Sequence, residues 1–402
     1  MSDVRILVVD KLAPAVVDRL SALGTVTVDT TAKDAALTRA IAARNPEVLV
    51  VRSTKVTRAD IEAGSALALV VRAGAGVNTI DLEAASHRGV YVANCPGKNA
   101  IAVAELAIGH LINLDRRIAD NVAALREHRW DKKAFGAARG LFGRTLAVLG
   151  TGQIGQETIS RARALGMKVV AWSRSLTPAA ASALGVERAE SPEEAVAGAD
   201  AVSVHLALAP ETRGLVGESV FAAMRPGAFF INTARAEVVD EEALLRAIAG
   251  KQLRAGLDVF AREPAAGTGS FADPLVDSPA VYGTHHIGAS TDQSEEAVGE
   301  AVVEIVAAYR AGGAIPNCVN LATHTPATHQ LVIRHADQVG VLAGVLDILR
   351  EADINVETMQ NIVFSGGHAA CARISTVGEL AAGTLARLAA APHIFAVSQV
   401  KL

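Results

Sequence analysis

The sequence predicts an α/β protein with two doubly wound, Rossmann-like domains and a smaller ferredoxin-like domain at the C-terminus. Three observations support this fold class. Short apolar runs and helical stretches alternate up to about residue 287, as in the β-α-β units of parallel sheets. Hydrophobic residues make up 50% of the 402-residue chain and aromatic residues only 3%, so the cores must consist of Ala, Val, Leu and Ile. A strand, a glycine motif and a helix follow one another at residues 145–165.

The first unit is a complete small α/β sheet that precedes the glycine motif. The expected strands are Val4–Val9, Val26–Asp29, Val48–Val51, Leu67–Arg72 and Val90–Ala93, with helices at Pro14–Leu23 and Asp34–Ala43. Two loops at strand ends, 51–55 and 71–78, place cations next to hydroxyl groups or small residues. Ligands bind beyond the carboxyl ends of parallel strands, so both loops are candidates for anion binding. The alternative is that both are ordinary solvated turns.

The glycine motif predicts dinucleotide binding. An apolar run, Leu146–Leu149, ends at Gly150, and Gly152 and Gly155 follow. The first glycine suits a tight turn, the second lets the backbone approach a pyrophosphate, and the third lets the helix pack on the strand. The diphosphate would lie on the free N–H groups at the start of a helix expected at Gln156–Leu165.

The second unit continues from the motif as another doubly wound sheet, which spans about residues 99 to 287. A long apolar helix, Ala100–Leu114, is expected to cross into it, and an irregular connection at 130–143 leads to the motif. The further strands are Lys168–Trp172, Ala201–His205, Ala228–Asn232, Ala255–Val259 and Val281–Thr284, with helices at Ala181–Leu184, Ser219–Met224 and Glu241–Ala249. Ser290–Gln293 is interpreted as a capping box that starts a helix running to about Arg310.

The pattern changes after a linker with two prolines at 315–328. The strands expected here are Gln330–Arg334, Ile354–Val363, Ala369–Ser375 and Ile394–Val400, with helices at Val341–Glu351 and Ala381–Ala389. This β-α-β-β-α-β order is typical of ferredoxin-like domains. A small domain of this kind without a catalytic constellation favours regulation or assembly.

Three charged residues follow strands of the second unit: Arg235, Glu263 and His286. Taken singly, they are explained as a surface cation, a turn residue and a loop histidine. Together, after a dinucleotide motif, they favour hydride transfer at a 2-hydroxy acid. The histidine would take the hydroxyl proton, the carboxylate would orient the imidazole and raise its pKa, and the guanidinium would hold the substrate carboxylate. His285 stands next to His286, and the local pattern rather than physics selects His286.

Composition and charge exclude other classes of partner. The net charge is -4 without a basic block, so no nucleic acid is expected. Three widely spaced cysteines form neither a disulfide framework nor a C-x-x-C metal pair, which favours the cytoplasm and predicts no metal. The N-terminus enters a strand without a signal-peptide pattern, and the most apolar helix is too short for a bilayer, so no membrane association is expected.

The sequence resembles the D-2-hydroxyacid dehydrogenase family over nearly all of residues 1–320. The matching stretches are VRSTKVT, RAGAGVNTIDLEAA, NCPGKNAIAVAELA, TLAVLGTGQIGQ, NTARAEVVDEEALL, GLDVFAREP and HHIGAST. The resemblance is greatest to the branch that oxidises 3-phosphoglycerate in L-serine synthesis, and cations at Arg52 and Arg72 fit a phosphate end. The alternatives are a glyoxylate or hydroxypyruvate reductase on the same scaffold and a dinucleotide-sensing protein without turnover.

The resemblance implies a role for each site residue. Arg235, Glu263 and His286 form the catalytic set. Residues facing the substrate are Arg52, Ser53, Arg72, Gly74 and Asn99. Those facing the cofactor are Gly150, Gly152, Gln153, Ile154, Gly155, Ser173, Arg174, Thr233, Asp258 and Gly288, with Gln153 and Ile154 over the pyrophosphate and Asp258 at the nicotinamide amide. The substrate-binding domain is then discontinuous (1–98 and 288–320) around a dinucleotide-binding domain (99–287).

Residues 329–402, after a linker at 321–328, resemble the small-molecule-sensing ACT domain. The similarity rests on IRHADQVGVL and the following DINV. In serine-regulated relatives a His and two Asn bind the amino acid across a domain–domain interface, and His335, Asp337 and Asn355 match them. L-serine is therefore a candidate effector, although Asp337 replaces an Asn and cannot donate a hydrogen bond. The resemblance also implies homodimers through the dinucleotide domains and homotetramers through the ACT domains.

Three departures from the family pattern bear on specificity. Ser173 stands where an Asp commonly binds the ribose of NAD, and Arg174 follows it. Without that carboxylate a 2′-phosphate is not repelled, and Arg174 could pair with it, so NADP is expected to be tolerated or preferred over NAD. Ala236-Glu237 replaces the usual Gly-Gly after the catalytic Arg, and His285 replaces a Pro.

Overall fold

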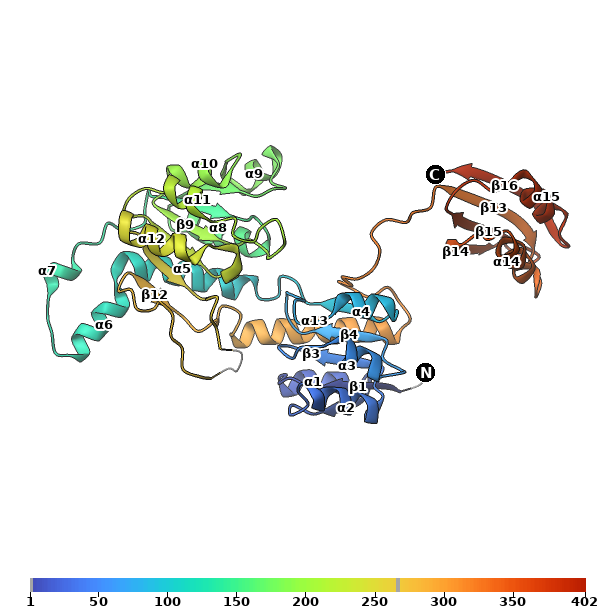
Figure 1. The fold of residues 1–402 in the computed structure, drawn as a ribbon, viewed down its shortest axis with the longest axis horizontal. Coiled ribbons are helices and arrows are strands. Elements are labelled where there is room, and N and C mark those ends of the chain that lie inside the picture. The colour runs from blue at the N-terminus through green and yellow to red at the C-terminus, as the bar shows by residue number, and fades with distance from the viewer. Residues whose placement is uncertain (1–2, 265–267) are drawn as a thin grey trace. The chain divides into compact units, whose positions relative to one another are not determined.

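Three β-sheets make up the structure, a computed structural model that describes residues 3–264 and 268–402. The chain divides into two units, Met1–Asn320 and Leu321–Leu402. The first unit contains two parallel sheets and the second an antiparallel one (Figure 1). The predicted α/β class with a separate C-terminal sheet is confirmed.

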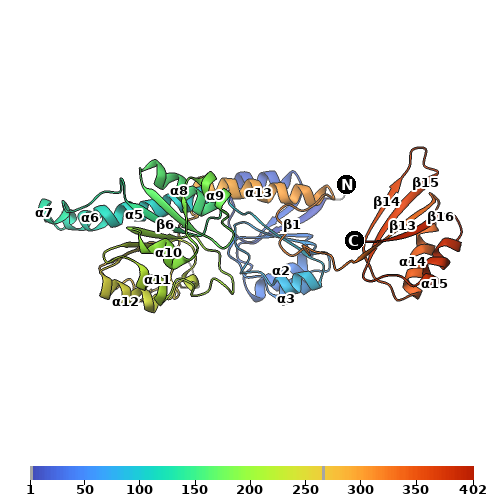
Figure 2. The same ribbon diagram turned by 90° about the horizontal axis from the view of Figure 1, so that it is seen from above.

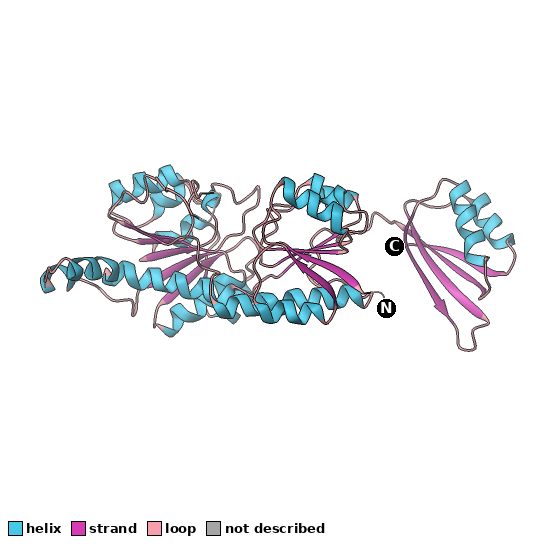
Figure 3. Cartoon of the chain, turned by 90° about the horizontal axis from the view of Figure 1, so that it is seen from below, coloured by secondary structure: helices cyan, strands magenta, loops and turns pink. Residues whose placement is uncertain are grey.

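The first sheet has the strand order β2-β1-β3-β4-β5, all parallel. Its strands are β1 (Val4–Val8), β2 (Gly24–Val28), β3 (Val48–Val51), β4 (Leu69–Arg72) and β5 (Tyr91–Asn94). Helices α1 (Pro14–Ser21), α2 (Ala35–Arg44), α3 (Arg58–Ala63), α4 (Leu82–His87) and α13 (Asp292–Arg310) accompany it, and Figure 3 shows helices on both faces. The chain reverses its direction of winding between β1 and β3, so the crevice for a ligand opens beyond their carboxyl ends.

The second sheet has the order β12-β11-β10-β9-β6-β7-β8, again all parallel. Its strands are β6 (Thr145–Leu149), β7 (Lys168–Trp172), β8 (Glu187–Arg188), β9 (Ala201–Val204), β10 (Phe229–Asn232), β11 (Arg254–Leu257) and β12 (Val281–Gly283). The winding reverses between β6 and β9, which is the switch point of a dinucleotide-binding fold. The glycine motif follows β6 and therefore lies at this switch point.

The helices of the second sheet differ from the prediction in several places. They are α5 (Ala100–Arg116), α6 (Ile118–Arg126), α7 (Lys132–Phe135), α8 (Gln153–Ala164), α9 (Pro178–Leu184), α10 (Pro192–Ala197), α11 (Glu218–Ala223), the 3-10 turn η1 (Ala236–Val238) and α12 (Glu241–Lys251). The helix after the glycine motif begins at Gln153 rather than Gln156 because Gly152 is its N-cap. Residues 130–143 are not wholly irregular, since they contain α7. Among the described residues, no helix combines the length and apolarity needed to cross a membrane.

Helix α13 begins one residue later than the predicted capping box implies. Its N-cap is Thr291 rather than Ser290, and the Thr291 hydroxyl accepts from the backbone N–H of Ser294 at 3.1 Å. The helix returns to the first sheet, where it packs against α1 and β4. The first sheet is therefore completed by residues far along the chain.

The segment before the C-terminal unit is not a free linker throughout, contrary to the expectation for 315–328. The N–H of Val319 donates to the carbonyl of Val92 at 2.8 Å, and the N–H of Asn94 donates to Asn317 at 3.3 Å. The side chain of Asn320 accepts from the N–H of Val92 at 2.8 Å. This stretch thus covers the edge of β5 and ties residues 317–320 to the first sheet.

The C-terminal unit has the antiparallel order β14-β15-β13-β16. Its elements are β13 (His329–Ala336), α14 (Val341–Glu351), β14 (Val356–Val363), β15 (Ala369–Thr376), α15 (Ala382–Ala390) and β16 (Ile394–Lys401). Both helices cover one face of the sheet (Figure 2). The predicted ferredoxin-like arrangement is present.

The glycine motif generates a prediction about stability. A Cβ on Gly155 would collide with the carbonyl oxygen of Gly150, whereas nothing lies within 4 Å of a Cβ on Gly152. Backbone cannot yield as a side chain can, so Gly155→Ala should destabilise the cofactor-free protein by about 1–3 kcal/mol. Gly152→Ala is the matched control and should change this stability by less than about 0.5 kcal/mol. Thermal unfolding without cofactor measures both, and equal midpoints for the two variants would contradict the assignment.

Candidate active site

A histidine–carboxylate pair lies at the carboxyl ends of β11 and β12. Nδ1 of His286 is 2.7 Å from Oε2 of Glu263. The other carboxylate oxygen of Glu263 accepts from the backbone N–H of Phe260 at 2.9 Å. Because a carboxylate only accepts, Nδ1 carries the proton, and Nε2 remains available to a substrate. The structure thus brings together two of the three predicted catalytic residues.

The pKa values of this pair are shifted in opposite directions. The hydrogen bond to Glu263 raises the pKa of His286, although burial opposes this. Burial alone would raise the pKa of Glu263, but the hydrogen bonds from His286 and from the N–H of Phe260 outweigh it and lower the pKa. The carboxylate therefore stays ionised while the imidazole becomes a stronger base.

Asp258 holds the loop that carries His286. Its Oδ1 accepts from the hydroxyl of Thr284 at 2.6 Å and from the N–H of Ile287 at 2.9 Å, and its Oδ2 accepts from the N–H of Gly288 at 2.8 Å. Asp258 is only 1% exposed. Two of the predicted cofactor residues, Asp258 and Gly288, are therefore hydrogen-bonded to each other. The contact of Asp258 with a nicotinamide amide stays a prediction.

A second histidine supports the same loop from α5. Nε2 of His110 is 3.1 Å from the hydroxyl of Thr284. Since that hydroxyl donates its proton to Asp258, it must accept from a protonated Nε2 of His110. Burial lowers the pKa of His110, which keeps the ring neutral. Sequence reasoning missed this residue, and the available indication was a histidine within the apolar run Ala100–Leu114.

Arg235 connects this pair to the first sheet. Its Nη1 donates to the carbonyl of Ala234 at 2.7 Å, and its Nη2 would lie 3.3 Å from a Cβ on Gly76. Burial and the guanidinium charges of Arg235 and Arg52 lower the pKa of Arg72. The charges of Arg235 and Arg52 therefore act on Arg72, and an anion among these guanidinium groups would relieve the repulsion.

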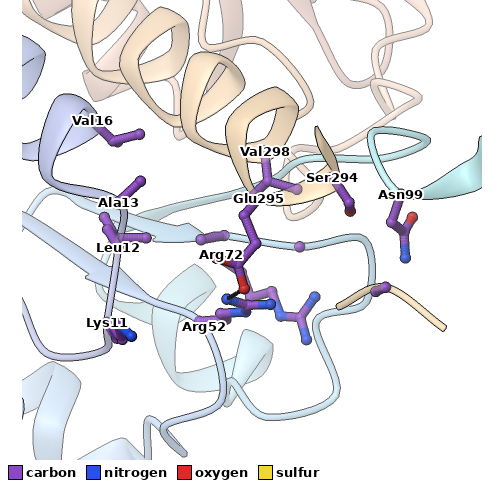
Figure 4. Close-up of a pocket in the computed structure, with 13 residues that line it drawn as sticks. Lys11, Leu12, Ala13, Val16, Arg52, Arg72, Asn99, Ser294, Glu295 and Val298 are labelled. Carbon is purple, nitrogen blue, oxygen red and sulfur yellow. Dashed lines mark hydrogen bonds and ion pairs between the residues drawn. The ribbon is translucent and has the colours of Figure 1, made fainter. Parts of the chain in front are cut away.

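A pocket joins four of the five predicted substrate residues (Figure 4). Arg52, Arg72, Gly74 and Asn99 line it, together with Lys11 and Glu295, which the sequence analysis did not select. Nε of Arg72 and Oδ1 of Asn99 are buried and have no hydrogen-bond partner among the described residues. Ser53, the fifth predicted residue, instead donates its hydroxyl to Asp10 at 3.2 Å.

Asp10 organises the loop of Arg52. It follows β1, and its Oδ2 accepts from the N–H groups of Arg52, Ser53 and Thr54 at 2.6, 3.0 and 3.0 Å. Its Oδ1 accepts from Nζ of Lys33 at 2.5 Å. Burial alone would raise the pKa of Asp10, but these hydrogen bonds hold it well below its usual range. Sequence reasoning missed Asp10 because its importance depends on β1 lying next to β3.

The predicted cofactor residues lie along the switch point of the second sheet. Gly150 adopts φ +101 and approaches the backbone of His205 at the end of β9. Gly152 caps α8, which holds Gln153, Ile154 and Gly155 in its first turn. Thr233 follows β10, and its hydroxyl, like Nδ1 of His205, is buried and unpartnered among the described residues. Burial lowers the pKa of His205 to about 3, so this ring is neutral.

Ser173 and Arg174 follow β7, the strand next to the motif. Arg174 is 80% exposed, and its Nη1 lies 4.0 Å from Oε2 of Glu211. An exposed pair at this distance is weak, so the guanidinium can turn toward a bound nucleotide. Of the two residues that replace the usual Gly-Gly after Arg235, Ala236 is buried and Glu237 is exposed.

Within one C-terminal unit, two of the three predicted effector residues lie at one end of the sheet and the third at the other. Asp337 directly follows β13 and is close to His335, whereas Asn355 precedes β14. His335 is 1% exposed, and its Nε2 lies 3.1 Å from Oδ1 of Asn361. Asn355 donates to Glu357 at 2.9 Å and stands beside the start of β14. In the sheet, Val356 aligns with His329 through Thr376, which places Asn355 at the opposite end from His335, roughly 20 Å along the strands.

Comparisons with known proteins agree with this geometry. The family described as "D-isomer specific 2-hydroxyacid dehydrogenase, NAD binding domain" matches residues 108–288. A solved structure from Thermus thermophilus is 32% identical with a TM-score of 0.70, over 78% of this chain and 99% of that one. The chain belongs to the D-isomer-specific 2-hydroxyacid dehydrogenase family.

Two other members of this family frame the question of substrate. A D-3-phosphoglycerate dehydrogenase from Methanocaldococcus jannaschii is 38% identical over 320 residues, or 79% of this chain. The chain spans 60% of the length of that relative. The solved structure of a glyoxylate reductase from Paecilomyes thermophila is 27% identical with a TM-score of 0.70, over 79% of this chain and 99% of that one.

The pair of His286 and Glu263 generates a pH prediction. Glu263→Gln removes the negative charge that raises the pKa of His286, so this pKa should fall. Oxidation needs the neutral imidazole as base, so the acid limb of kcat/KM for alcohol oxidation should move to lower pH. Because the ring also loses its charged anchor, kcat should fall by about 10²-fold or more. Glu242→Gln, on the surface of α12, serves as the control, and an unmoved acid limb in Glu263→Gln would contradict the pairing.

Proposed function

We propose that this chain is an NAD(P)-dependent dehydrogenase that oxidises 3-phosphoglycerate to 3-phosphohydroxypyruvate, the first step of L-serine synthesis. The observation that carries the proposal is a histidine–carboxylate pair on a chain segment that runs, at Ala289, into the wall of a pocket rich in cations. The name of the Methanocaldococcus relative supports the same substrate.

Each catalytic residue has one task in this reaction. Nε2 of His286 takes the proton of the substrate hydroxyl, and Glu263 stabilises the resulting imidazolium. Arg235 holds the substrate carboxylate through paired N–H donors. A bound nicotinamide would supply the acceptor for the hydride that leaves the carbon bearing this hydroxyl. In the reverse direction, the imidazolium returns its proton to the keto oxygen.

The cationic pocket favours a phosphorylated acid over the alternative substrates. Lys11, Arg52 and Arg72 line it, and a phosphate oxygen can accept from each of them. Glyoxylate and hydroxypyruvate have no anionic group beyond their carboxylate, so they offer no second anion to these cations. The intact pair of His286 and Glu263 speaks against a dinucleotide sensor without turnover.

The cofactor proposal rests on the end of β7. Ser173 provides a hydroxyl rather than a carboxylate there, and Arg174 lies beside it with only a distant exposed partner. We therefore propose that NADP is used as well as NAD or in preference to it.

We also propose that the chain forms homo-oligomers, with L-serine as a candidate effector. The chain around α6 leaves large apolar side chains in solvent: Ile118, Leu125 and Trp130 are 47%, 54% and 82% exposed. A second copy would cover them, in a homodimer or within a homotetramer. Since His335 and Asn355 are far apart in one unit, an effector site that uses both requires two copies. Sedimentation of the full chain with and without L-serine tests both points.

The proposed reaction predicts a substrate order. Reduction of 3-phosphohydroxypyruvate should have a kcat/KM well above that of hydroxypyruvate or glyoxylate. Arg52→Gln should raise KM for the phosphorylated acid by about 10-fold or more and leave KM for hydroxypyruvate within about twofold. Arg58→Gln, an exposed change on α3, serves as the control. A higher kcat/KM for glyoxylate would instead support the reductase.

The cofactor proposal predicts comparable use of both nucleotides. The kcat/KM values for NADPH and NADH should lie within about tenfold of each other, or favour NADPH. Ser173→Asp should then shift the ratio toward NADH by about 10-fold or more, because a carboxylate repels the 2′-phosphate. A hundredfold preference of the unmodified protein for NADH would refute the proposal.

A further inference from the structure

The cationic pocket contains a carboxylate that the proposed reaction does not use. Glu295 lies in the first turns of α13, and its Oε1 is 2.7 Å from Nη1 of Arg52 (Figure 4). Lys11, Arg52 and Arg72 are the cations that line this pocket, and Glu295 carries the one carboxylate among its described lining residues. A carboxylate therefore occupies a donor of one of the three cations proposed to bind the substrate phosphate.

Neither the backbone of Arg52 nor the helix α13 depends on this ion pair for its position. The backbone of Arg52 is held by Asp10, and α13 is capped by Thr291 and packs through its buried apolar face. The side chains of Arg52 and Glu295 are 34% and 41% exposed, so solvent screens the pair. A pair of this kind adds little to folding stability. Its presence is better explained by what it does to ligands.

We propose that Glu295 is a specificity-determining residue that competes with the anionic end of the substrate for Arg52. This inference rests on the proposed function, because it concerns the same pocket. A phosphate binds a guanidinium best through two parallel hydrogen bonds, and Glu295 already takes Nη1. The substrate phosphate must displace this carboxylate or bind beside it.

Competition of this kind acts on binding rather than on the chemical step. Glu295 contacts Arg52, while proton transfer takes place at His286 and Glu263. Glu295 therefore raises KM for phosphorylated acids and leaves kcat nearly unchanged. Acids without a second anionic group do not need Arg52, so their KM is not affected. Glu295 thereby reduces the difference in KM between phosphorylated 2-keto acids and those without a phosphate.

The variant Glu295→Gln tests this directly, because the amide keeps the shape and removes the charge. KM for 3-phosphohydroxypyruvate should fall about tenfold, with kcat and KM for hydroxypyruvate within about twofold. Glu296→Gln is the matched control: it removes the same charge from the next residue of α13, which lies outside the pocket. Glu295→Asp, which shortens the reach to Arg52, should give an intermediate fall in KM.

Two results would overturn the inference. A rise in KM for the phosphorylated acid in Glu295→Gln would mean that Glu295 positions Arg52 for the substrate. An unchanged KM for both acids would mean that the ion pair is irrelevant to binding. A thermal midpoint equal to that of the Glu296→Gln control shows that the comparison concerns folded protein, and Glu295→Asp supplies the same test if Glu295→Gln is unstable.

A separate measurement distinguishes this inference from the proposed function. If the unmodified chain does not turn over 3-phosphohydroxypyruvate, the proposed function fails. Inorganic phosphate can then be titrated as an inhibitor of whichever 2-keto acid is reduced, or as a stabiliser in thermal unfolding. Tighter binding of phosphate to Glu295→Gln than to the unmodified protein supports the inference, and equal or weaker binding overturns it.

Discussion

A buried carboxylate at the end of a parallel strand fixes each half of the site. Asp10 follows β1 and binds three successive N–H groups of the loop that begins at Arg52. Asp258 follows β11 and binds the backbone on the C-terminal side of His286. In both places a carboxylate accepts from backbone N–H groups of the loop, which satisfies these donors. The two halves of the candidate site are thus built on the same physical principle.

The charges of the site follow from where these loops meet. Arg52 and Arg72 come from the first sheet and Arg235 from the second, and the charges of Arg52 and Arg235 both act on Arg72. Glu263 is the counter-charge for His286, and Glu295 is the counter-charge for Arg52. In the proposed reaction, Glu263 sets the strength of the base, and by our inference Glu295 sets the affinity of the pocket for anions. If both hold, a change at Glu295 alters anion affinity without altering the chemistry at His286.

Much of this arrangement could be predicted from sequence because it depends on local pattern. The strands of both parallel sheets are continuous apolar runs, and Gly150, Gly152 and Gly155 mark the turn between β6 and α8. Short elements such as α3, α10 and β8 were missed because six residues or fewer carry no clear periodicity. The start of α8 was placed three residues late because Gly155 was assigned to the loop, although it lies in the first turn of the helix.

Residues that act only through tertiary neighbours could not be found in this way. Asp10 and Glu295 stand in ordinary contexts, and nothing near them in sequence shows that they meet Arg52. Glu295 and Arg52 are 243 positions apart, and their pairing requires α13 to return to the first sheet. Asn355 stays a prediction: similarity to a sensing domain selects it, strand register separates it from His335 within one unit, and the predicted effector site lies across an interface between two domains.

The backbone of His286 lies in the left-handed region, at φ +53. For a residue with a Cβ this conformation costs on the order of 1 kcal/mol, so the loop keeps it only while Asp258 holds the N–H groups of Ile287 and Gly288. These two amide hydrogens can exchange with solvent only when the loop leaves Asp258. Their exchange rates therefore report how much of the time His286 is in place, even in protein with no substrate or nucleotide bound.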